Sequence, residues 1–114
     1  MKTIPTKFTL KERSVEERPR EKLISQGPQH LSNSELLALL IGSGNQGESA
    51  IQLMQRLLVS LGNDLSKLHR ISIEELLLWK GIGPAKAVKI KAALELGKRI
   101  QGLPAQKKSW LHQQ

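Results

Sequence analysis

The sequence contains the same local pattern twice, and this duplication constrains the fold more than any other feature. Each copy begins with a serine followed three residues later by a glutamate, at 32–35 and 72–75. This is the capping box that starts an α-helix. Each box is followed by an apolar run and then by a pair of glycines, at 42–44 and 81–83. The boxes lie 40 residues apart and the glycine pairs 39. We infer an internal duplication of a unit made of a helix, a glycine hairpin and a second helix.

The first glycine loop has the spacing of a dinucleotide-binding loop, and an acidic residue, Asp64, follows about 20 residues later. That fold requires a strand before the loop. The preceding run LLALLI instead follows a capping box and contains a single β-branched residue, Ile41. The loop therefore joins two helices, and a dinucleotide site is excluded.

Apolar periodicity predicts the other helices. Apolar residues recur at helical spacing over 50–61, and Gly62 follows where a capping glycine belongs. A connector helix is expected near 64–69 with Asp64 as its N-cap, and a short helix in the stretch ERPREKLISQG.

We therefore predict an all-α fold. Its main part is a tandem helix-hairpin-helix domain of five helices with an extra short N-terminal helix, together spanning residues 17–101. An N-terminal arm is expected at 1–16 and a linker or tail at 102–114.

The positive charge is concentrated near the C-terminus. Of the net charge of +8, residues 80–114 contribute +7, with eight lysines and arginines against one glutamate. Such a basic stretch is typical of proteins that bind a phosphate backbone, and a solvated lysine face is the alternative. Aromatic residues make up 3% of the chain, so stacking on bases is not expected as the main binding mode.

Composition also bears on location and chemistry. The chain has no cysteine, which excludes disulfides, thiolate catalysis and cysteine-bound zinc. No apolar run approaches the roughly 20 residues of a membrane span, and the N-terminus lacks the apolar core of a signal peptide. We expect a cytoplasmic, monomeric protein that does not bind membranes.

The second hairpin, Gly81-Ile82-Gly83-Pro84, carries the strongest functional signal. Glycine lets the backbone approach a ligand closely, and Pro84 fits the first position of a helix. The free amides of the following turn would form an anion site that reads no base sequence. Ile82 should turn into the core. Three lysines surround this turn: Lys80, Lys86 and Lys89.

The stretch LLLWKGIGPAKAVKIKAAL resembles the helix-hairpin-helix motif of DNA repair and recombination proteins. Together with ERPREKLISQGPQHLSNSELLALLIGSG, it is similar to the N-terminal domain of the RadC family of bacterial proteins, over roughly residues 15–101. This resemblance implies phosphate contacts from the hairpin and its flanks. The predicted contacts are Lys80, Gly81, Ile82, Gly83, Ala85, Lys86 and Lys89, with secondary contacts at Gly42, Gly44, Lys91 and Arg99.

The resemblance also bears on cofactors and catalysis. Carbonyls of such hairpins sometimes hold a monovalent cation, which makes Gly81–Gly83 a candidate cation site; no other cofactor is predicted. RadC relatives carry a further C-terminal domain of the JAB metalloprotease type. The histidines of this chain, His30, His69 and His112, are scattered without ligand spacing. We therefore predict no metal site and no catalytic activity for the chain.

The first hairpin departs from the second. It has Ser43 in place of the isoleucine and carries Glu48, whose carboxylate would repel phosphate unless it serves its own helix N-terminus. We predict a mainly structural role for this hairpin. We also expect the basic residues of 18–22 to be a solvated helix face, Trp79 to belong to the core, and Trp110 to contact a following domain.

Two functions remain open. The first is a sequence-independent DNA-binding module acting in DNA repair. The second is a protein-interaction scaffold that docks a JAB-type domain or another partner.

Overall fold

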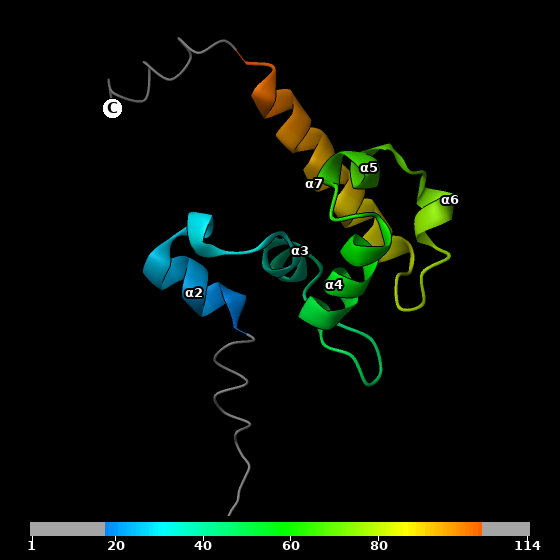
Figure 1. The fold of residues 1–114 in the computed structure, drawn as a ribbon, viewed down its shortest axis with the longest axis horizontal. Coiled ribbons are helices and arrows are strands. Elements are labelled where there is room, and N and C mark those ends of the chain that lie inside the picture. The colour runs from blue at the N-terminus through cyan, green and yellow to red at the C-terminus, as the bar shows by residue number, and fades with distance from the viewer. Residues whose placement is uncertain (1–17, 104–114) are drawn as a thin grey trace, which may run out of the picture.

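The computed structural model describes residues 18–103 and confirms the all-α fold (Figure 1). Within that range the only β-type pairing is an isolated bridge between Asn45 and Glu48. The predicted arm at 1–16 and residues 104–114 of the predicted tail, with Trp110, lie outside the described range. The elements are α2 (Pro19–Gln26), the 3-10 turn η1 (Pro28–His30), α3 (Asn33–Ile41), α4 (Ala50–Ser60), α5 (Leu65–Arg70), α6 (Ile73–Leu76) and α7 (Pro84–Gln101).

The order of these elements matches the predicted duplication. Helices α3 and α4 flank the first glycine hairpin, and α6 and α7 flank the second. Helix α5 connects the two units, and α2 is the additional N-terminal helix. Helix α6 is shorter than the sequence suggests, because the run after Leu76 turns toward the second hairpin.

Serine caps fix where three of the helices begin. The predicted boxes at Ser32 and Ser72 are both closed, with each serine hydroxyl accepting from a glutamate amide and each glutamate accepting in return. A third box, missed in the sequence, starts α4: the Ser49 hydroxyl accepts from the Gln52 amide at 3.1 Å, and the Gln52 side chain accepts from Ser49 at 2.9 Å. As predicted, Asp64 caps α5 through the Ser66 amide.

Glycine allows two helices to end sharply. Gly42 ends α3 in the left-handed conformation with φ 80°. After α4, Gly62 (φ 69°) donates to Val59 and Asn63 donates to Leu58, which is the Schellman arrangement. After the Gly42 turn, α4 packs against α3.

The core is centred on α4. Four of its apolar residues, Leu53, Met54, Leu57 and Leu58, are at most 1% exposed. They pack with buried residues of the other helices and of the second hairpin: Leu37, Ile41, Leu68, Leu76, Ile82, Ala87 and Ile90. Because both hairpins end in helices that contribute to this one core, packing places them in a common unit.

Two elements extend from this core. Helix α2 lies against α3, where the Lys22 ammonium pairs with the Glu35 carboxylate at 3.1 Å. At the other end of the chain, every residue of 96–103 is exposed, and the last turns of α7 project away from the other helices (Figure 1).

Candidate nucleic-acid interface

The second hairpin has the geometry expected from its sequence. Gly81 has φ 93°, a left-handed value that disfavours other residues. Ile82 is 4% exposed and packs in the core, as predicted, while its amide donates to the Trp79 carbonyl at 3.1 Å. The apolar residue between the glycines therefore anchors the turn to the domain.

The N-terminus of α7 leaves amides directed outward. Gly83 is its N-cap and supplies no side chain, and Pro84 stands at the first position. The first amide of this helix that bonds back to the turn is that of Ala87, which donates to the Gly83 carbonyl at 3.0 Å. The amides of Ala85 and Lys86 precede it in the first turn, where a helix has no carbonyl to offer them. These two amides lie at the positive end of an 18-residue helix.

The Lys86 side chain joins the two hairpins. Its ammonium donates to the Gly44 carbonyl at 2.7 Å and to the Gly81 carbonyl at 3.1 Å, and the residue is half-buried. The sequence assigned Lys86 to phosphate, but in the structure its charge is directed at two backbone oxygens. The same contact occupies the carbonyl of Gly81, one of the oxygens at the candidate cation site.

A second bridge is made by Arg56 of α4. Its guanidinium holds both Glu48 oxygens at 2.9 Å and also donates to the Lys80 carbonyl at 2.6 Å. The hydrogen bond from Arg56 holds the pKa of Glu48 below its usual value, and nearby Lys80 adds to this effect. The helix that follows Glu48 is capped by Ser49 and Gln52. The charge of Glu48 is offset by Arg56.

At two positions of the hairpins a Cβ atom would lie very close to neighbouring atoms. A Cβ on Gly44 would lie 2.0 Å from the Glu48 carbonyl oxygen, and one on Gly81 would lie 3.0 Å from the Asn45 side chain. A Cβ on Gly83 would meet no atom within 4 Å. Gly44 therefore allows the first hairpin to close on itself and Gly81 allows the second hairpin to approach Asn45 of the first, whereas Gly83 leaves space beside the amides of α7.

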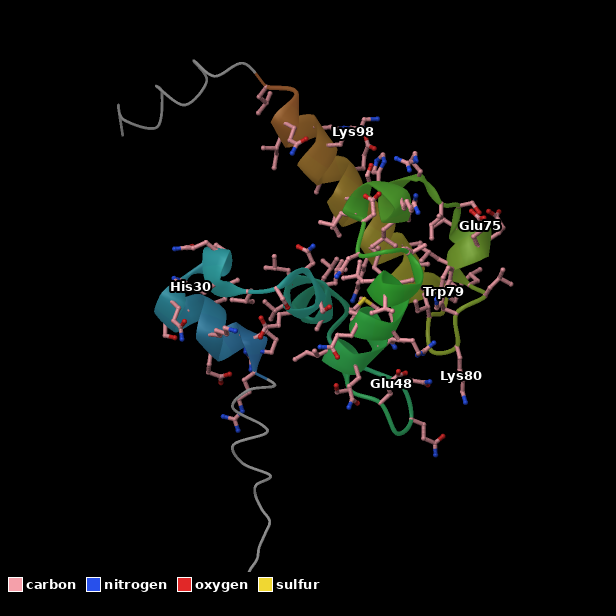
Figure 2. All side chains as sticks on the ribbon, viewed as in Figure 1. His30, Glu48, Glu75, Trp79, Lys80 and Lys98 are labelled. Carbon is pink, nitrogen blue, oxygen red and sulfur yellow. The ribbon has the colours of Figure 1, made fainter. Side chains whose placement is uncertain are left out.

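The remaining predicted contacts fall in different places. Lys80 and Lys89 are exposed, and Figure 2 shows Lys80 extending away from the ribbon on the side where Glu48 lies. The Lys91 ammonium donates to the carbonyls of His69 and Ile71, which ties α7 to the end of α5. Arg99 pairs with Glu95 at 3.2 Å. Only the two exposed lysines thus extend into solvent beside the hairpin.

Trp79 packs against the core, as predicted. It is half-buried, and its indole Nε1 donates to the Ser60 hydroxyl at 3.1 Å. Over residues 18–103, no group of three or more potential metal-binding side chains is found, and no helix is long and apolar enough to cross a membrane.

The fold and site define a tandem helix-hairpin-helix domain whose hairpins are joined by side-chain contacts. Comparison with known proteins assigns its family: residues 10–88, more than half of the chain, match the model of the UPF0758 N-terminal domain. The chain therefore belongs to the UPF0758 family, which is the RadC family, and represents its N-terminal domain.

Its relatives include UPF0758 proteins of several bacteria. The protein of Flavobacterium johnsoniae is 52% identical over 92 residues, which is 81% of this chain and 40% of that protein. The protein of Coprothermobacter proteolyticus is 52% identical over 94 residues, 82% of this chain and 40% of that protein. The chain thus spans about two fifths of the length of these relatives. No solved structure matches it.

Proposed function

We propose that this domain binds DNA without sequence preference, through the second hairpin. The amides of Ala85 and Lys86 would hold one phosphate, and the side chains of Lys80 and Lys89 would supply charge beside it. We include a role in DNA repair, because the hairpin motif resembles that of repair proteins.

The observation that carries this proposal is the contrast between the two helix starts. At α4, the Ser49 hydroxyl accepts from the Gln52 amide in the first turn, and the Gln52 side chain accepts from the Ser49 amide. At α7, Gly83 offers no side-chain cap, and two exposed lysines lie within six residues. An uncapped helix start beside exposed cations is suited to an anion, and phosphate needs no base recognition to bind there.

The test is fluorescence anisotropy of labelled duplex, single-stranded and branched DNA, from about 50 to 200 mM salt. The variant Lys80→Glu/Lys89→Glu should lose most of the affinity for every sequence. Lys86 is left intact, because its ammonium joins the hairpins and its loss would confuse binding with folding.

A matched control reverses two charges elsewhere. The variant Lys67→Glu/Arg70→Glu changes two exposed cations of α5 and makes the same change in net charge. It should bind almost as the parent does. Equal losses in both variants, or no binding at low salt by a folded parent, would rule out the hairpin as the DNA site.

One observation supports docking as a second candidate function. On the projecting end of α7, Leu96 and Ile100 are 61% and 66% exposed and share one face by their spacing, and Leu103, just after the helix, is 55% exposed. We call these three residues the α7 stripe. Exposed apolar faces often mark interaction sites, and the relatives are about two and a half times longer than the matched segment. The partner in this second candidate is a domain that follows α7, such as one of the JAB type.

A further inference from the structure

A groove of about 620 Å³ lies between the start of α2 and the first hairpin. One wall is formed by Arg18, Pro19 and Arg20, and the other by the hairpin and the first turn of α4. We call it the α2 groove. Its hairpin wall consists of Gly42, Ser43, Gly44 and Ser49.

The charges around the groove favour an anion. Arg18 and Arg20 are both exposed and line it, and among the described lining residues Glu21 supplies the one carboxylate. The other acidic residue of this region, Glu48, is held by Arg56 at 2.9 Å and does not line the groove. One guanidinium group can donate two parallel hydrogen bonds to two oxygens of the same phosphate, which makes arginine well suited to a nucleic-acid backbone.

One residue, Gly44, belongs to the groove and also contacts a side chain that follows the second hairpin. Gly44 lines the groove, and its carbonyl accepts the Lys86 hydrogen bond that joins the two hairpins. In Figure 1 the start of α2 and both hairpin loops lie along one edge of the molecule. A strand held at the second hairpin therefore has a path over the first hairpin into the groove.

We propose that the α2 groove is a second phosphate-binding site on the same DNA, with Arg18 and Arg20 as its contact residues. This inference rests on the proposed function and extends it. From the sequence, these arginines are interpreted as a solvated helix face and the first hairpin as structural. The fold places the arginines beside that hairpin, where they supply the positive charge that its own sequence lacks.

The test compares charge-removing and charge-keeping variants of the groove. Arg18→Gln/Arg20→Gln should weaken duplex binding roughly tenfold at about 50 mM salt and lower the slope of log affinity against log salt by about two. Arg18→Lys/Arg20→Lys should lose less affinity than the glutamine variant, because both charges remain although the paired guanidinium hydrogen bonds are lost. The control Lys67→Gln/Arg70→Gln removes two charges from α5 and should behave as the parent.

The outcomes separate the two proposals. If the parent binds DNA and Lys80→Glu/Lys89→Glu loses binding, while the groove glutamine variant matches its α5 control, the groove proposal is wrong and the hairpin proposal stands. The groove proposal is also wrong if the lysine variant binds as poorly as the glutamine variant. If the folded parent binds no DNA, both proposals fail.

Discussion

Among single residues, Lys86 is the one whose ammonium joins the two hairpins by hydrogen bonds to both. Lys86→Met keeps the aliphatic length but leaves the carbonyls of Gly44 and Gly81 without their charged donor. We expect a loss of about 1–3 kcal/mol in the free energy of unfolding, measured by urea denaturation. Lys89→Met, at an exposed position of the same helix, should change it by less than about 0.5 kcal/mol. Equal effects would show that the bridge contributes nothing to stability.

Gly44 and Gly83 should differ in how much an alanine substitution destabilises the protein. Gly44→Ala would place a methyl group 2.0 Å from the Glu48 carbonyl oxygen, so the first hairpin must shift. We expect clear destabilisation and a lower melting temperature in calorimetry. Gly83→Ala meets open space at φ −95° and should melt close to the parent. A Gly44→Ala protein that melts with the parent would contradict the close approach described here.

At the scale of elements, Glu35 links α3 to α2 and makes this contact sensitive to pH. Partial burial raises its pKa, but the hydrogen bonds from the Ser32 amide and Lys22 outweigh this, and the pKa lies below the usual 4.5. A lowered pKa in the folded state stabilises the protein above the unfolded value, and this stability is lost as pH falls through the folded pKa.

We therefore expect the free energy of unfolding to fall as pH drops below about 4.5, with a shallower fall in Glu35→Gln. Glutamine can still close the capping box, as Gln52 does at α4, so the variant removes the charge and keeps the cap. Urea denaturation at several pH values measures both slopes. Parallel slopes would mean that the titration of Glu35 does not contribute to this pH dependence.

The elements were predictable from sequence where their signals are local. The boxes at Ser32 and Ser72, the Asp64 cap and the inward turn of Ile82 all depend on residues a few positions apart. The Ser49 box follows the same rule with glutamine in the third position, so a search that included glutamine would have found it.

The bridges between the hairpins could not be found in this way. Lys86 reaches 42 residues back to Gly44, and Arg56 reaches 24 residues forward to Lys80. Both acceptors are backbone carbonyls, which every residue type has, so the residue types do not indicate them. From the sequence, Lys86 is therefore predicted to contact phosphate. Its partners, the carbonyls of Gly44 and Gly81, become evident only when both units are packed on α4.

At the scale of the whole molecule, the α7 stripe should be dispensable for folding. Leu96→Gln/Ile100→Gln changes two residues that are 61% and 66% exposed, and we expect less than about 0.5 kcal/mol of change in the free energy of unfolding. Leu94→Gln, two residues earlier and packed against the core, should cost more than about 1 kcal/mol. Thermal and urea unfolding give these values, and gel filtration of each variant reports association.

DNA affinity should be unchanged in the stripe variant, because the stripe lies at the end of α7 remote from the second hairpin. If the stripe variant instead loses as much stability as Leu94→Gln, the stripe must be covered in the isolated chain, and a parent that elutes as a dimer would identify the cover as a second copy. Stability retained together with DNA binding would leave this end of α7 available to a partner domain while the hairpins hold DNA.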